Sequence, residues 1–137
     1  MNRAFDNGLH AAIAAGPPAR FLALFGSQAT GTAHAGSDID VAWLPADTDI
    51  SLGQELAFQA ELTRMAGREV DLVRVDQTST LCRMEIARHG ILLAGDRSAF
   101  ARFRAEAIAE FLDYEPAFRA ASERFRRRLA AGGSSRR

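Results

Sequence analysis

The sequence contains no lysine, since all seventeen of its basic residues are arginine. This absence excludes Schiff-base chemistry, a lysine-containing phosphate-binding loop and a lysine-nucleophile ligase. Cys82 is the only cysteine, so an intramolecular disulfide and a cysteine metal cluster are also excluded. A single cysteine fits a reducing, cytoplasmic setting. No stretch approaches the roughly 20 consecutive apolar residues of a membrane span, so we expect no membrane partner.

The chain also lacks an excess of charge of either sign. Seventeen acidic residues balance the seventeen basic ones, which gives no global argument for nucleic-acid or membrane-surface binding. The 137 residues are 47% hydrophobic, enough for one domain with a hydrophobic core but not for two. We therefore expect a single domain over residues 1–131, followed by a disordered Gly-Ser-Arg tail at 132–137.

Hydrophobic patterning predicts alternating helices and strands. We expect helices at 4–15, 51–66 and 79–89, and strands at 20–25, 38–44, 69–75 and 91–94. The chain from about residue 98 reads as helix, divided near Pro116 because proline is poorly tolerated inside one. These elements predict an α/β (α+β) fold, a small mixed β-sheet flanked by helices, with the strand order left open.

Paired carboxylates are the first candidate site. Asp38 and Asp40 project from the same face of their predicted strand, because strand side chains alternate. Two carboxylates on one face repel each other unless water or a cation compensates, and oxygen ligands favour Mg²⁺. Asp71 lies in the predicted strand 69–75, so three carboxylates converge if the two strands are neighbours. The alternative for an isolated Asp-x-Asp is a turn or strand end that faces solvent.

A glycine and a serine follow the first predicted strand. Gly26 lets the backbone approach a ligand closely, and the Ser27 hydroxyl can donate a hydrogen bond to a phosphate oxygen. The free backbone N–H groups of a helix that starts here would also attract phosphate. A phosphate cradle beside a carboxylate cluster indicates a nucleoside triphosphate site.

These motifs resemble those of a known superfamily. Gly26-Ser27, ten intervening residues and then Asp38-Ile39-Asp40, with a later Asp71 on a strand, is similar to the signature of the DNA polymerase beta-like nucleotidyltransferases. Within that superfamily, the chain resembles the minimal nucleotidyltransferases, or MNT proteins, over about residues 20–131. The segments that carry this second resemblance are Val70–Val73, Arg83–Ile86, Gly90–Leu93 and Phe111–Pro116.

The resemblance implies a polymerase beta palm-like fold and a specific reaction. MNT proteins are typically the antitoxins of HEPN/MNT toxin–antitoxin pairs, which implies a Mg²⁺-dependent transfer of AMP from ATP to a tyrosine of a cognate HEPN toxin. Asp38, Asp40 and Asp71 would then hold two Mg²⁺ ions, with Asp71 also the candidate general base, while Gly26 and Ser27 hold the triphosphate. Two alternatives stay open, an antitoxin that acts by binding alone and a nucleotidyltransferase that acts on a small molecule.

Several other residues keep two interpretations. Thr30 stands where family members often carry arginine. We therefore assign no residue of this chain to the additional phosphate contact that such an arginine could make. Arg83 would either reach the triphosphate or form a surface ion pair. His34 is either a phosphate contact or solvent-exposed. The arginine cluster at residues 124 and 126–128 is either a solvated helix face or a partner surface, and no direct nucleic-acid partner is expected.

Overall fold

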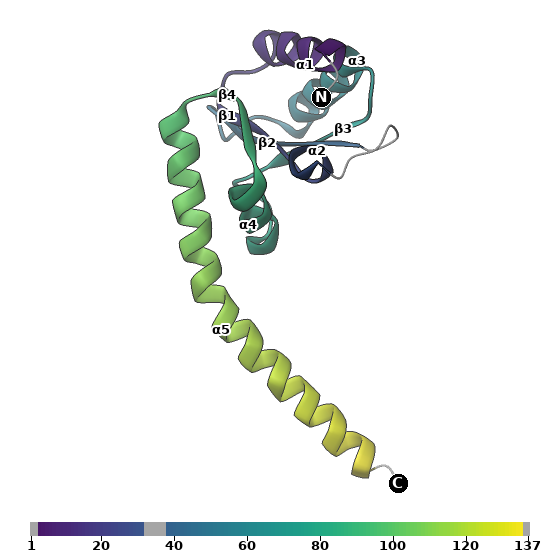
Figure 1. The fold of residues 1–137 in the computed structure, drawn as a ribbon, viewed down its shortest axis with the longest axis vertical. Coiled ribbons are helices and arrows are strands. Elements are labelled where there is room, and N and C mark those ends of the chain that lie inside the picture. The colour runs from purple at the N-terminus through teal and green to yellow at the C-terminus, as the bar shows by residue number, and fades with distance from the viewer. Residues whose placement is uncertain (1–2, 32–37, 136–137) are drawn as a thin grey trace.

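The computed structural model describes residues 3–31 and 38–135. The elements in chain order are α1 (Arg3–Ala15), β1 (Ala19–Phe25), α2 (Ser27–Thr30), β2 (Ile39–Pro45), α3 (Leu52–Ala66), β3 (Val70–Arg74), α4 (Thr80–His89), β4 (Ile91–Gly95) and α5 (Arg97–Ser135). The strands form one mixed sheet in the order β3-β2-β1-β4 (Figure 1). Strand β1 is antiparallel to β2 and β4, and β2 is parallel to β3. The predicted fold class, helices and strands are confirmed, with shifts of one or two residues at their ends.

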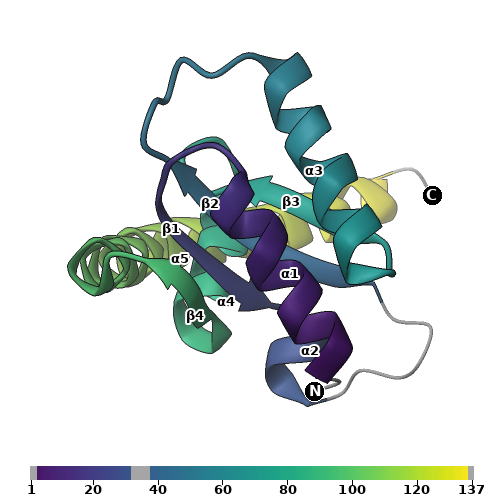
Figure 2. The ribbon, with the colours of Figure 1, turned by 90° about the horizontal axis from the view of Figure 1, so that it is seen from above.

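Helices α1 and α3 cover one face of the sheet. Figure 2 shows them side by side over the strands, with α4 and α5 behind the sheet. Trp43 is fully buried beneath this helical layer and packs edge-on against Phe58 of α3 at a ring separation of 5.3 Å. The other buried residues of this core are Leu9, Ala12, Leu22, Leu24, Ile39, Val41, Leu62, Ala66, Val70 and Leu72. Alternate residues of β2 enter this core, as the period-two pattern predicts.

Helix α4 and the first part of α5 cover the opposite face. Phe21 of β1 contacts Phe100 and Phe103 of α5, with ring centroids 5.1 and 5.4 Å apart. The remaining buried residues of this second core are Ala23, Phe25, Ala42, Val75, Ile86, Ala87 and Ala107. Cys82 packs half-buried against it as a small apolar residue. The sheet is therefore buried on both faces, and only its ends remain open for a site.

The expected division of the C-terminal helix near Pro116 is wrong. Helix α5 has 39 residues and continues through Pro116 without a break, although Figure 1 shows that it changes direction about midway. Proline removes the hydrogen bond to the carbonyl of Leu112, but both residues are exposed, so water can bind that carbonyl. Helix α5 ends at Ser135, within the segment 132–137 for which a tail is expected. Among the described residues, no helix combines the length and apolar character needed to cross a membrane.

Candidate active site

The turn after β1 is built on Gly26. This residue has φ 71° and ψ −150°, a conformation that side chains disfavour. Its carbonyl accepts hydrogen bonds from the backbone N–H groups of Ala29 and Thr30, both at 3.1 Å, which starts the short helix α2. No side chain caps this helix start. The side-chain nitrogen of Gln28 is buried and has no hydrogen-bond partner within the described part of the chain, so the turn has an unused donor beside Ser27.

Gly26 lies directly against the carboxylate of Asp40. A Cβ atom at Gly26 would overlap Oδ2 of Asp40 and would lie 3.3 Å from its Cγ. The pairing of β1 with β2 causes this approach, because Phe25 and Asp40 are opposite each other in the antiparallel register. The predicted phosphate cradle and the predicted carboxylate pair therefore meet at one end of the sheet.

The third predicted carboxylate belongs to the neighbouring strand. Strands β2 and β3 are parallel, and Asp40 is paired in register with Asp71. The N–H of Ile39 donates to the carbonyl of Glu69 at 2.9 Å, which fixes this register where β2 begins. The condition for convergence, that the two strands be neighbours, is thus met for Asp40 and Asp71. Asp38 is exposed just before β2 begins, one residue from the strand.

Two side chains of α3 hold the outer edge of β3. The N–H groups of Val70 and Leu72 flank Asp71 and point away from β2, where an edge strand has no partner strand. The first donates to Thr63 Oγ1 at 3.0 Å and the second to Gln59 Oε1 at 2.8 Å. Helix α3 thereby fixes the backbone on both sides of Asp71. Sequence reasoning missed this role, because a polar residue on a helix does not reveal which strand edge it faces.

The electrostatics of the site centre on Asp40. Its half-buried position raises the pKa of the Asp40 carboxyl above the ordinary value of 3.8, and the negative charges of Asp71 and Asp38 raise this pKa further. The ionisation of Asp40 is therefore coupled to the charges of Asp38 and Asp71. Asp38 and Asp71 thus impose on Asp40 an electrostatic penalty that a cation would relieve.

The donor set fits a hard divalent cation. All three side chains offer carboxylate oxygens, the ligands that Mg²⁺ prefers. In the ranges 3–31 and 38–135, no group of three or more His, Cys, Asp or Glu side chains already has the arrangement of a metal site. The chemistry of the three carboxylates and their mutual repulsion, and not a finished coordination geometry, are what make them suitable ligands.

The structure resolves the interpretation of Arg83 in favour of contacts within the protein. Its Nε lies 3.2 Å from Oε2 of Glu110, its Nη1 donates to the carbonyl of Val75, and its guanidinium lies over the ring of Phe103 at 5.1 Å. These contacts join α4 to α5. His89 lies in the last turn of α4, where a cation suits the helix dipole. His34 lies outside the described residues.

Comparisons with known proteins agree with this geometry. The family described as "Polymerase beta, Nucleotidyltransferase" matches residues 10–98, which contain Gly26, Ser27 and all three carboxylates. The chain is also 33% identical over 96 residues to the "Protein adenylyltransferase MntA" of Shewanella oneidensis. That alignment spans 69% of this chain and 68% of the relative.

Solved structures extend the similarity to most of the chain. A crystal structure described as a toxin–antitoxin with AMP-PNP matches with a TM-score of 0.76 and 26% identity, over 86% of this chain and 95% of the other. A complex of the tri-AMPylated Shewanella oneidensis HEPN toxin with its MNT antitoxin matches with a TM-score of 0.73, over 90% of this chain and 97% of the other. The identity in the second case is 22%, so this match bears on the fold alone.

Proposed function

Because the chain belongs to the polymerase beta nucleotidyltransferase family, as a minimal nucleotidyltransferase, we propose that it transfers AMP from ATP to a tyrosine of a HEPN toxin. This transfer would neutralise the toxin. The observation that carries the proposal is the meeting of Gly26 with Asp40 and Asp71 at one end of the sheet. The relative named a protein adenylyltransferase and the similar chain crystallised with AMP-PNP both support an ATP-dependent reaction on a protein.

Three carboxylates are assigned to the metal. Asp38, Asp40 and Asp71 would hold two Mg²⁺ ions, since they supply the oxygen ligands and the uncompensated negative charge. When bound, Mg²⁺ would offset the charge of the triphosphate and lower the pKa of the attacking hydroxyl. Asp40 lies two residues after Asp38 and is paired in register with Asp71 of β3, so its loss affects the ligand set on both sides.

The remaining residues bind the triphosphate and accept a proton. Gly26 lets the backbone approach the phosphates, and Ser27 donates its hydroxyl to a phosphate oxygen. The tyrosine oxygen attacks the α-phosphorus of ATP and forms a new P–O bond, while the bond to the β-phosphate breaks and pyrophosphate leaves. Asp71 accepts the phenolic proton. An ordinary phenol has a pKa near 10, so a nearby base assists the attack.

The small size of the domain favours a protein as the acceptor. We assign residues 1–131 to one nucleotidyltransferase domain, and within the described part of this range all the strands belong to a single sheet. A protein acceptor would supply its own binding surface. A reducing, cytoplasmic setting is consistent with the single free cysteine.

The test is incubation of the chain with ATP, Mg²⁺ and the HEPN protein encoded beside it. Intact-mass spectrometry should show the partner gaining AMP, and tandem mass spectrometry should place the AMP on a tyrosine. The control is the double variant Asp38→Ala with Asp40→Ala. Neutralisation of the partner by this variant at the same substoichiometric dose as the wild type would contradict the proposal, because neutralisation would then not depend on the carboxylates assigned to catalysis. Modification of small molecules only, with no mass added to the partner, would favour the small-molecule alternative.

A further inference from the structure

Helix α5 carries apolar residues on one face that are buried near its start, half-buried at Phe111 and Tyr114, and exposed at Phe125 and Leu129. Seven apolar positions along α5, at intervals of three, four or eleven residues, fall within about 80° of the helix circumference, at about 100° per residue. We call this set the α5 stripe; its residues are Phe100, Phe103, Ala107, Phe111, Tyr114, Phe125 and Leu129. Phe100, Phe103 and Ala107 are buried, whereas Phe125 and Leu129 are 58% and 59% exposed.

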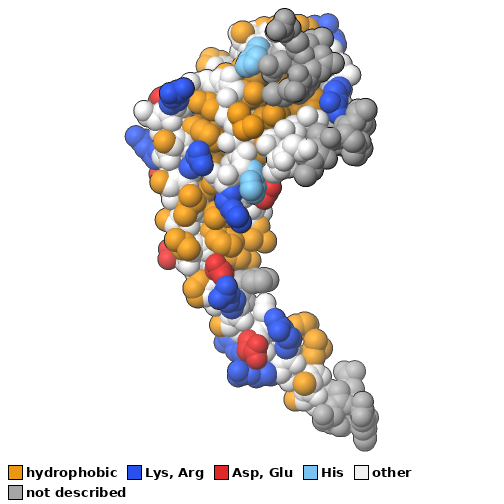
Figure 3. Space-filling model, viewed as in Figure 1, with side chains coloured by type: hydrophobic (Ala, Val, Ile, Leu, Met, Phe, Trp, Pro, Cys, Tyr) orange, Lys and Arg blue, Asp and Glu red, His pale blue; other side chains and the backbone are white. Residues whose placement is uncertain are grey.

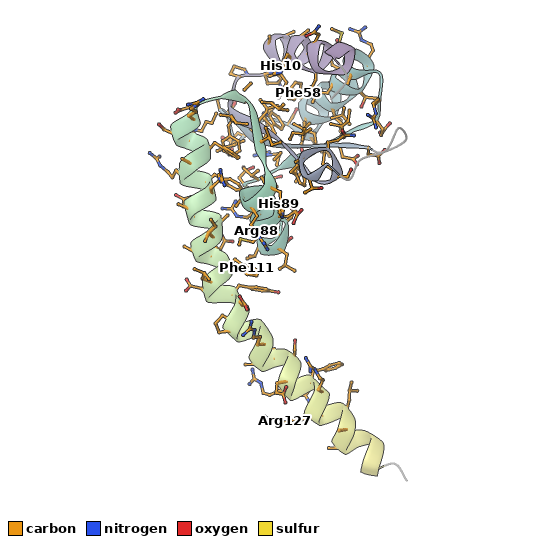
Figure 4. The ribbon with its side chains drawn as sticks, in the orientation of Figure 1. His10, Phe58, Arg88, His89, Phe111 and Arg127 are labelled. Carbon is orange, nitrogen blue, oxygen red and sulfur yellow. The ribbon has the colours of Figure 1, made fainter. Side chains whose placement is uncertain are left out.

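The change from buried to exposed occurs where α4 begins. Thr80, the first residue of α4, donates its hydroxyl to Glu110 at 3.2 Å, and α4 packs along α5 from there toward Phe100. Figure 4 shows Phe111 where α5 passes this end of α4, and Arg127 on the part that extends away from the domain. The segment from Phe111 to Leu129 is about 28 Å long at 1.5 Å per residue. The stripe therefore continues past the helix that covers it.

Arginines line both edges of the uncovered part of the stripe. Arg119 and Arg126 follow one edge, and Arg124 and Arg128 follow the other. Arg119 is paired with Glu115, but the other three have no ion pair with any residue in the described ranges. Figure 3 shows arginine beside hydrophobic side chains along this extended part of α5. The surface is thus apolar in the middle and positive at its rims.

This charge pattern identifies the kind of occupant. A second copy of the chain would bring the same four arginines against four more, with only Glu115 among the edge residues of each copy to offset them. Such like-charge contacts are destabilising. An amphipathic helix with acidic residues beside its apolar face would bury Phe125 and Leu129 and pair with the free arginines. Helix α4 already packs apolar residues on the first half of the stripe, although the ion pair there joins Arg83 of α4 to Glu110 of α5.

We propose that Phe111–Leu129 is the docking surface for an acidic amphipathic helix of the protein that receives AMP. This inference rests on the proposed function, because that function supplies a protein acceptor. The end of the sheet that carries Gly26 and the carboxylates then binds ATP, and the α5 surface binds the acceptor protein.

The experiment compares matched variants of the full chain. Phe125→Gln with Leu129→Gln removes the exposed apolar centre, and Leu112→Gln is its control, since Leu112 is 61% exposed but lies off the stripe. Arg128→Glu reverses a charge at the edge of the stripe. Arg127→Glu makes the same change on the opposite side, where Arg127 pairs with Glu123. Glutamine and glutamate are both good helix formers, so circular dichroism should show unchanged helicity.

Binding is measured by calorimetry without ATP, against the HEPN protein encoded with this chain. The double glutamine variant should raise Kd at least about tenfold, as expected for a buried apolar anchor. Arg128→Glu should raise Kd by about threefold or more at low salt and less at high salt. Both controls should stay within about twofold of the wild type. Wild-type affinity in both stripe variants would overturn the proposal.

Two further measurements separate the possible failures. AMP transfer by the wild type is followed by intact mass, so an absence of transfer contradicts the proposed function, whereas transfer with unaffected binding in the stripe variants contradicts the docking surface alone. Sedimentation of the chain without partner tests the second copy. A wild-type dimer that becomes monomeric in the stripe variants would show that another copy covers the stripe, which would also overturn the proposal.

Discussion

Gly26 has no room for a side chain because the carboxylate of Asp40 occupies the space where a Cβ would lie. The φ of 71° at Gly26 disfavours a side chain independently. Two separate constraints therefore require glycine at the end of β1. The first of them places the proposed phosphate cradle in direct contact with a carboxylate that we propose as a metal ligand.

Gly26→Ala should lower AMP transfer by at least about 100-fold, because the added methyl group displaces the Asp40 carboxylate. Gly67→Ala separates this effect from backbone strain. Gly67 has a similar φ of 72° but no atom within 4 Å of the position that a Cβ would take, so alanine there adds backbone strain without displacing a carboxylate. Both variants should lose about 1 kcal/mol of stability from the positive φ. Thermal unfolding and transfer assays measure the two effects, and equal activity in the two variants would show that the overlap with Asp40 has no functional consequence.

Asp40→Asn should raise the thermal midpoint of the metal-free protein at neutral pH. Because the pKa of Asp40 is raised above 3.8, the folded state binds this proton more tightly than the unfolded state. The resulting stability is fully present below pH 3.8 and is lost as the pH rises through the raised folded pKa. Asparagine avoids that loss, so its advantage should shrink as the pH falls through the same window.

Scanning calorimetry in EDTA across this pH range measures the effect, with Asp113→Asn on exposed α5 as the control. Addition of Mg²⁺ should stabilise the wild type more than Asp40→Asn. A lower midpoint for Asp40→Asn at neutral pH without metal would mean that the carboxylate makes a stabilising contact that outweighs its burial.

Asp71→Asn should lower kcat for AMP transfer by at least about 100-fold, because asparagine neither accepts the phenolic proton nor supplies a charged ligand. The fold should be preserved, since Asp71 is exposed and its flanking backbone groups bond to α3. Affinity for the partner should stay within about twofold of the wild type. Quenched-flow transfer assays and calorimetry test the two parts, and full activity would exclude Asp71 from the mechanism.

The sequence was sufficient to predict most helices and strands and to select the candidate site residues. Turn residues such as Gly26 and the apolar runs beside them mark where strands begin and end. The strand order was not predictable, because pairing of β2 with β3 depends on how α3 crosses the sheet and not on either strand's own pattern. The continuity of α5 through Pro116 was missed because local propensity does not reveal that Leu112 and Pro116 are exposed, where water can replace the lost hydrogen bond.

Gln59→Ala should reduce both stability and activity, although Gln59 lies outside the carboxylate cluster. Its Oε1 accepts the N–H of Leu72 at 2.8 Å, so alanine leaves a part-buried backbone donor without a partner. Such a loss costs about 1–3 kcal/mol. Loosening of β3 at Leu72 should also lower kcat by several-fold through Asp71, while KM for ATP changes little. Gln59→Glu, which keeps an acceptor at the same position, should recover most of the stability; an unchanged kcat in Gln59→Ala would limit the role of Gln59 to stability.

Arg83→Met should destabilise the protein without changing its affinity for ATP, which separates the two interpretations of this residue. The guanidinium bonds to Glu110 and to the Val75 carbonyl and lies over Phe103, so its side chain is committed to the contact between α4 and α5. Methionine keeps much of the apolar stem but loses the hydrogen bonds, for a cost of about 1–3 kcal/mol.

Chemical denaturation measures this loss, and titration with a non-hydrolysable ATP analogue measures affinity. A large rise in Kd for the analogue, with little loss of stability, would instead show that Arg83 leaves Glu110 to bind the triphosphate. Glu110 is 44% exposed, so the ion pair itself contributes little, and most of the loss should come from the part-buried hydrogen bond to Val75 and the contact with Phe103.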